Sequence, residues 1–96
     1  MKDLAYIKKV LGGIKSELES RFHVRTIGVF GSFARGEATP DSDIDIIVDF
    51  NRSVGVEFID LAEYLEGKLE TRVDLVSRKG IRHGYLESIE KDVAYI

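Results

Sequence analysis

The chain has 96 residues, a formal net charge of -3 and no cysteine. Its length predicts one domain, residues 1–96, with one hydrophobic core. Its 44% hydrophobic and 32% charged residues are typical of a globular chain rather than a disordered one. The absence of cysteine excludes disulfides, thiolate chemistry and zinc sites with Cys ligands. The slight acidity argues against a general nucleic-acid binder, which normally carries a basic surplus.

The sequence also predicts where the protein works. No segment approaches the roughly 20 apolar residues that a membrane helix needs. The stretch from Met1 to Leu4 lacks the continuous apolar run that begins a signal peptide. We therefore expect a cytoplasmic protein that makes no contact with a membrane.

In chain order, the first predicted element is an amphipathic helix. Its apolar residues recur at steps of three and four, at Leu4, Ile7, Leu11, Ile14, Leu18 and Phe22. Gly12 and Gly13 each weaken a helix by about 1 kcal/mol relative to alanine, so we expect a kink or close packing there. The β-branched and aromatic run from Thr26 to Phe30 predicts a buried strand. A glycine-bounded corner, residues 31–36, and a turn-rich stretch, residues 37–42, follow it.

The second predicted strand runs from Asp43 to Phe50 and alternates strictly. One face carries Ile44, Ile46, Val48 and Phe50, and the other carries Asp43, Asp45, Ile47 and Asp49. The remaining elements are a helix at 58–69, a strand at 71–77, a short helix at 85–91 and a small last strand at 93–96. A helix between the second and third strands predicts a right-handed crossover and a parallel pair, whereas the shorter connection before them allows an antiparallel pair. The fold class is therefore α/β, a two-layer domain with a small mixed sheet packed with helices.

Two aspartates on the second strand are the first candidates for chemistry. Asp43 and Asp45 point the same way and lie about 6–7 Å apart by strand geometry. Such a pair can bind Mg²⁺, which prefers oxygen ligands and often combines a few carboxylates with substrate phosphates. Taken alone, this spacing is explained more readily by an exposed acidic strand end.

A third aspartate, Asp74, lies in the apolar third strand, where aspartate is uncommon. We expect it to be buried, and a buried carboxylate without a partner is costly. A cation shared with Asp43 and Asp45 would remove that cost. The alternative is an edge-strand aspartate that faces water or pairs with Arg72 or Arg78. We favour the metal site, because all three aspartates are present.

Gly31 and Ser32 predict the other half of a phosphate site. A glycine at the end of a strand lets the backbone approach a ligand, and a helix that follows presents free N–H groups to an anion. Alone, such a corner is more often an ordinary helix cap. Together with the aspartates, this corner favours transfer of a phosphoryl-type group. The sequence has no P-loop lysine motif or kinase motif set, so these residues fit a metal-aspartate transferase better than an ordinary kinase.

These residues carry a family resemblance. Gly31-Ser32, ten intervening residues and then Asp43-Ile44-Asp45 resemble the G-S-x(10)-D-x-D signature of the DNA polymerase β-like nucleotidyltransferase superfamily. The segment GSFARGEATPDSDIDIIV resembles its minimal nucleotidyltransferase branch. The resemblance covers essentially the whole chain, and Asp74 stands where the family has its third carboxylate.

The resemblance implies a role for each matching residue. Asp43, Asp45 and Asp74 would bind Mg²⁺, and Asp74 would also help to deprotonate the acceptor. Gly31 and Ser32 would contact the triphosphate. Arg35 matches a frequent family arginine, and it either contacts the nucleotide or braces the loop by pairing with a carboxylate.

The resemblance also implies an activity. It suggests transfer of a nucleotidyl group, AMP from ATP, to a hydroxyl. Members of this branch pair with an HEPN-type toxin RNase, so the implied role is an antitoxin that modifies a tyrosine of that partner. Larger relatives add a domain that holds the acceptor, so we expect a partner protein or a second subunit to supply it here. The alternative is a catalytically weak module that binds nucleotide and metal and regulates or occludes a partner.

Other polar residues have plainer explanations. The basic stretch from Arg78 to His83 is interpreted as a solvated loop rather than a contact with phosphates, and His83 would be an acid or base only if it lay near the aspartates. Four tyrosines are interpreted as packing residues with polar tips: Tyr6, Tyr64, Tyr85 and Tyr95.

Overall fold

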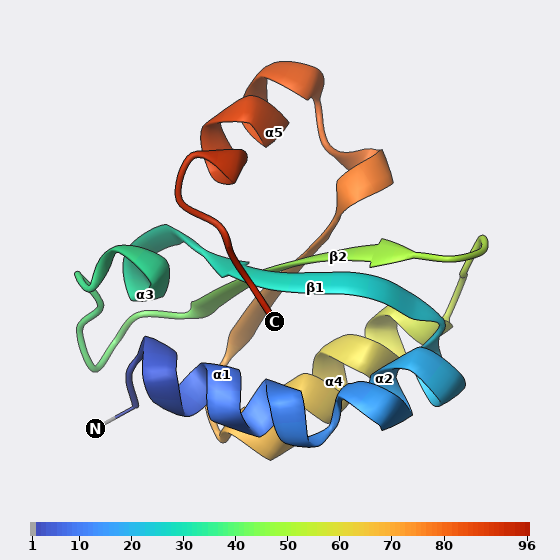
Figure 1. The fold of residues 1–96 in the computed structure, drawn as a ribbon, viewed down its shortest axis with the longest axis horizontal. Helices are drawn as coiled ribbons and strands as arrows, with labels where there is room; N and C mark the ends of the chain where they lie inside the picture. The colour runs from blue at the N-terminus through green and yellow to red at the C-terminus, as the bar shows by residue number, and fades with distance from the viewer. Residues whose placement is uncertain (1) are drawn as a thin grey trace.

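The computed structural model describes residues 2–96 as a four-stranded sheet with helices on both faces (Figure 1). In chain order the elements are α1 (Leu4–Gly13), α2 (Lys15–Phe22), β1 (Val24–Phe30), α3 (Gly31–Arg35), β2 (Ile44–Phe50), α4 (Glu57–Leu69), β3 (Val73–Ser77), the 3₁₀ helix η1 (Arg78–Gly80), α5 (His83–Glu90) and β4 (Ala94–Tyr95). The strand order is β3-β2-β1-β4, with β2 and β3 parallel and the other neighbours antiparallel. The predicted fold class and strand directions are confirmed. None of the described helices is long and apolar enough to cross a membrane.

The two faces of the sheet are covered unequally. Helices α1, α2 and α4 cover one face, and α5 lies over the other (Figure 1). The main core lies under the three helices, and β2 contributes to it Ile44, Ile46, Val48 and Phe50. On the second face, Ile47 packs with Phe30 and with Ile89 of α5. Because side chains alternate along a strand, Asp45 lies on the α5 face.

The first predicted helix is two helices. Helix α1 ends at Gly13 and α2 begins at Lys15, with Ile14 between them at φ -113° and ψ 8°. The apolar stripe continues through the break, because the buried residues are Ile7 and Leu11 in α1 and Leu18 and Phe22 in α2. The kink expected at the glycine pair is confirmed.

Helix α4 sets the position of β3. It buries Leu61, Leu65 and Leu69 against the core. The helix ends at Leu69, and the backbone of the next residue, Glu70, is left-handed at φ 52°. The Glu66 carboxylate accepts a hydrogen bond from the backbone N–H of Val73 at 2.9 Å. This contact ties the start of β3 to the helix that precedes it, and β3 then runs parallel to β2 at the edge of the sheet.

Gly28 of β1 is where β4 closes on the sheet. A Cβ at this position would lie 2.7 Å from Val93 Cγ2 and 3.1 Å from Tyr95 Cδ1. We expect Gly28→Ala to lower the free energy of unfolding by about 1–3 kcal/mol through overpacking. Urea unfolding measures this change, with Gly67→Ala as control, because a Cβ on that residue of α4 meets nothing within 4 Å. The control should gain about 0.5–1 kcal/mol. Equal stability of the two variants would contradict the packing described.

Candidate active site

Asp45 and Asp74 lie side by side on the α5 face of the sheet. Their Cα atoms are direct partners across β2 and β3, and Asp43 precedes β2 by one residue. The pKa of Asp45 is raised from 3.8 to about 6, first by burial and then by the charges of Asp74 and Asp43 and a hydrogen bond with Asp74. The three carboxylates therefore concentrate negative charge at one end of the sheet, where a cation would relieve their repulsion.

The prediction that Asp74 is buried is wrong. Its side chain is exposed, because β3 is the edge strand and has a sheet neighbour on one side only. The cost of a buried carboxylate is therefore no argument for a cation here. What distinguishes Asp74 is its register, which places it directly beside the partly buried Asp45.

Asp43 is engaged with a neighbour. Its Oδ1 lies 3.1 Å from Nε of Arg72, and both side chains are largely in water, with 47% and 78% of their surfaces exposed. As they stand, the described side chains include no group of three His, Cys, Asp or Glu residues arranged to hold a metal ion. Mg²⁺ is often held by one or two carboxylates together with substrate phosphates, so the pair Asp45 and Asp74 fits it. An exposed ion pair contributes only about 0–1 kcal/mol, so Asp43 can leave Arg72 at little cost.

The corner between β1 and α3 lies against Asp45. Gly31 has φ +73°, and a Cβ on it would lie 2.1 Å from Oδ2 of Asp45. The contact follows from the register, because Phe30 and Asp45 are partners across β1 and β2. The first N–H groups of a helix have no intrahelical acceptor, and no side chain in the described chain caps α3. The backbone at Gly31 and Ser32 can therefore offer donors beside the carboxylates.

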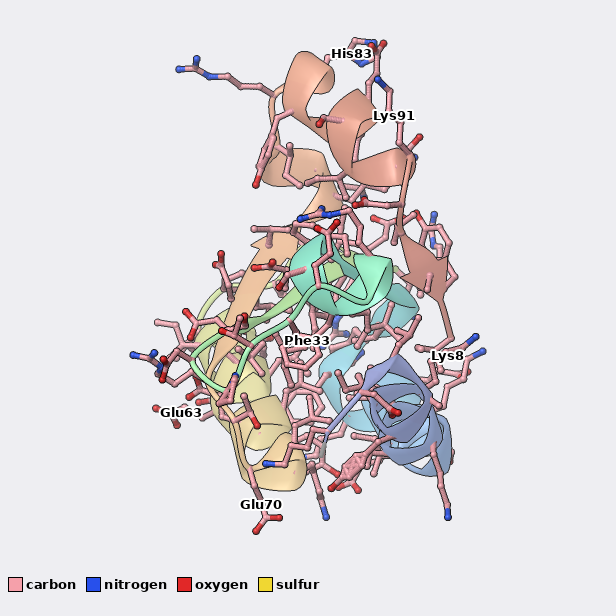
Figure 2. The ribbon with its side chains drawn as sticks, turned by 90° about the vertical axis from the view of Figure 1, so that its left-hand side faces the viewer. Lys8, Phe33, Glu63, Glu70, His83 and Lys91 are labelled. Carbon is pink, nitrogen blue, oxygen red and sulfur yellow. The ribbon has the colours of Figure 1, made fainter. Side chains whose placement is uncertain are left out.

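Helix α3 is held from two sides. Phe33 is buried and packs into the main core, below α3 in Figure 2. Arg35 donates from Nε to Glu37 at 2.9 Å and from Nη1 to Asp92 at 2.8 Å. These hydrogen bonds raise the pKa of the Arg35 guanidinium above its usual range, and the bond to Glu37 has the larger effect. Arg35 therefore braces the loop, which is one of its two expected roles, and its contact with a nucleotide stays a prediction.

A cavity of about 220 Å³ opens between this corner and α5. It is lined by residues from both sides, among them Gly31, Arg35, Asp45, Tyr85, Ser88 and Asp92. The sequence pattern does not identify the three residues from the α5 side as site residues. The prediction that Tyr85 is a packing residue is wrong, because 56% of Tyr85 is exposed. The available signal was the spacing of three between Tyr85 and Ser88, which puts them on one face of a helix.

A larger hollow of about 970 Å³ lies elsewhere, beside α1 and the loop 39–42. It reaches Arg72, the partner of Asp43, and it is also lined by Tyr6 and Phe33. The smaller cavity is the better candidate for chemistry, because Gly31 and Asp45 both line it.

The basic stretch after β3 lies away from the aspartates. His83 stands at the outer end of α5 (Figure 2), where its Nε2 is 2.8 Å from Glu87 and 86% of its side chain is exposed. Arg78 pairs with Glu90 and donates to the Tyr95 hydroxyl at 3.0 Å. These contacts fasten η1 and α5 to each other and to β4.

Comparison with known proteins gives concordant results. Residues 11–96 match the profile of a family described as the nucleotidyltransferase domain. Protein adenylyltransferase MntA of Thermococcus cleftensis is 46% identical over 97 residues, which cover 100% of this chain and 98% of that one. A solved structure described as a minimal nucleotidyltransferase superposes with a TM-score of 0.83 and 34% identity, over 97% of this chain and 95% of that chain. A complex of tri-AMPylated Shewanella oneidensis HEPN toxin with MNT antitoxin has a TM-score of 0.69 and 21% identity, over 93% of this chain and 70% of that chain, and shares the fold alone.

Proposed function

Because the chain belongs to the nucleotidyltransferase domain family, we propose that it transfers AMP from ATP, with Mg²⁺, to a tyrosine hydroxyl of an HEPN-type toxin and so acts as an antitoxin. The relative from T. cleftensis is named a protein adenylyltransferase, and one protein of the same fold is an MNT antitoxin in complex with an AMPylated HEPN toxin. The observation that carries the proposal is the register that sets Asp45 beside Asp74, in contact with the Gly31 corner.

The proposed site divides the work between two groups of residues. The backbone N–H groups at Gly31 and Ser32 bind the triphosphate, as helix N-termini bind anions. Asp43, Asp45 and Asp74 hold Mg²⁺, which when bound neutralises phosphate charge and lowers the pKa of an attacking hydroxyl. Positioning and electrostatic stabilisation then supply most of the rate enhancement.

The chemical step needs a base at the open edge of the sheet. The tyrosine oxygen attacks the α-phosphorus of ATP, and the tyrosine proton passes to the carboxylate of Asp74. The bond between the α-phosphorus and the oxygen that bridges to the β-phosphorus breaks, and pyrophosphate leaves. Because Asp74 is exposed on an edge strand, an acceptor carried by another protein can reach it.

Label transfer tests the proposal. The protein, co-purified with its partner, is incubated with Mg²⁺ and ATP labelled on the α-phosphate, and in parallel with ATP labelled on the γ-phosphate. We expect the α-label alone to appear on a tyrosine of the partner. Asp74→Asn should reduce the rate by about 100-fold or more, because a positioned general base typically contributes that factor.

Two results would overturn the proposal. Transfer of the γ-label alone would make the reaction that of a kinase. No transfer of either label to a partner that remains bound would identify a module that binds and occludes rather than modifies. Glu63→Gln, on an exposed position of α4, is the control for a general effect of removing an acidic side chain.

A further inference from the structure

Helix α5 presents one polar stripe to the proposed nucleotide site. Tyr85 and Ser88 are three positions apart in α5, so they share one face of the helix. Asp92 lies in the turn that follows α5. All three line the cavity that also contains Gly31 and Asp45. On its adjoining side α5 is anchored by Ile89, which is buried against the sheet. Tyr85 and Ser88 are therefore held at a fixed place beside Asp45.

Tyr85 differs from Tyr64 and Tyr95 in the contacts that its side chain makes. Tyr64 stacks on Phe22 at 5.0 Å between ring centroids and donates to Glu17, and the Tyr95 hydroxyl accepts from Arg78. The Tyr85 side chain is 56% exposed and, among the described residues, makes no comparable hydrogen bond or ring contact. Its ring is an open aromatic surface on the wall of a cavity.

The lining of the cavity offers contacts to two different parts of a nucleotide. The backbone at Gly31 can offer donors for phosphates, and Asp45 lies beside it in the same lining. The other aromatic ring that lines the cavity, Phe30, is only 6% exposed and packs with Ile89. Tyr85 is therefore the aromatic face on this wall that a planar base can reach.

We propose that Tyr85 is the stacking platform for the base of the nucleotide that the proposed function places in this cavity, and that it favours purine over pyrimidine triphosphates. Any base can stack on an aromatic side chain, since every base has a π-face. The larger purine ring covers more of the tyrosine than a pyrimidine ring does. The Ser88 hydroxyl, one turn along α5, lies on the same wall and can hydrogen-bond the base or the ribose.

Calorimetric titration with ligands that have a base and with one that lacks it tests the inference. The full-length protein and the variants Tyr85→Phe and Tyr85→Ala are titrated, in the presence of Mg²⁺, with ATP, with CTP and with inorganic tripolyphosphate. We expect Tyr85→Ala to weaken ATP binding by about 5- to 100-fold and to remove the preference for ATP over CTP. Tyr85→Phe keeps the ring and should bind ATP as the wild type does. Tripolyphosphate, which has no base, should bind all three proteins equally.

The outcomes separate this inference from the function on which it rests. ATP binding by Tyr85→Ala at wild-type strength would overturn the stacking role and leave the proposed function standing. If Tyr85→Ala lost equal affinity for ATP and for tripolyphosphate, the substitution would have distorted the whole site. If Tyr85→Phe lost as much affinity for ATP as Tyr85→Ala does, the effect would belong to the hydroxyl. Either result overturns the inference. If the wild type bound neither ATP nor tripolyphosphate, the proposed function itself would fail. A thermal melt of each variant confirms that the exposed position has not affected folding.

Discussion

Gly31→Ala is expected to abolish most of the activity by displacing Asp45. The new Cβ would lie 2.1 Å from Oδ2 of Asp45, closer than any two such atoms can approach, so either the carboxylate or the start of α3 must move. A displacement of about 1 Å in a catalytic site can cost about 100-fold in rate. We therefore expect kcat/KM to fall by about 100-fold or more, together with a loss of about 1–3 kcal/mol in stability from the strained backbone.

A second glycine provides the matched control. Gly36 ends α3 with the same φ of +73°, but a Cβ there would meet nothing within 4 Å. Gly36→Ala should therefore show the backbone strain without the displacement, and its stability loss should come with little loss of activity. Steady-state kinetics and urea unfolding of both variants make the comparison. If both lost activity equally, the close approach of Gly31 to Asp45 would have no special role.

A double variant isolates the contact itself. In Asp45→Ala the carboxylate is gone, so adding Gly31→Ala should cost less stability than it does in the wild type. The difference between the two costs measures the overlap of the added Cβ at position 31 with the Asp45 carboxylate, because Asp45→Ala removes the group that the new Cβ meets. Purely additive stabilities would mean that the overlap with the Asp45 carboxylate costs no stability.

The parts of the site that lie on one element could be predicted from the sequence. Strict alternation in β2 determined that Asp45 faces away from the main core, because side chains two apart share a face. The break in the first helix followed from two adjacent glycines. These predictions needed only local geometry, and the structure confirms them.

The parts that depend on how elements pack could not be read from local pattern. Asp74 has apolar neighbours on each side in the sequence, but its exposure is decided by the strand order, which leaves β3 at the edge. Tyr85 lines the cavity because Ile89 packs against Phe30 and Ile47 and so holds α5 on that face of the sheet. Arg35 meets Asp92 across 57 residues of chain. Each of these contacts is set by tertiary structure, so no window of the sequence contains it.

Asp45→Asn is expected to abolish activity while making the protein more stable. The proposed role of the carboxylate is to hold Mg²⁺ against the phosphates, and charge stabilisation by a bound metal contributes several kcal/mol to the transition state, about 1000-fold in rate. In the absence of metal the same carboxylate lowers the stability of the folded protein, because burial and the neighbouring Asp74 and Asp43 disfavour its charged form. Replacing it with a neutral amide removes that cost, which is about 1 kcal/mol at neutral pH once the partial exposure of the site is taken into account.

The stability gain should depend on pH in a defined direction. The pKa of Asp45 is raised from 3.8 to about 6 in the folded protein. Between these two values the folded chain holds a proton that the unfolded chain has released, so the stability of the wild type falls as the pH rises. The advantage of Asp45→Asn should therefore be absent below pH 3.8, grow up to about pH 6 and stay constant above it. Urea unfolding of both proteins across this range, without divalent metal, measures it.

Adding ligand should reverse the order of stability. A ligand that binds only the folded state stabilises it in proportion to its concentration over its Kd. At pH 7, Mg²⁺ with a non-hydrolysable ATP analogue should therefore raise the Tm of the wild type and leave that of Asp45→Asn nearly unchanged. If the variant were no more stable than the wild type without metal, the three aspartates would not repel one another as described. If both proteins gained equally from Mg²⁺ and nucleotide, the metal would be held without Asp45, and the site would have to be sought elsewhere on the sheet.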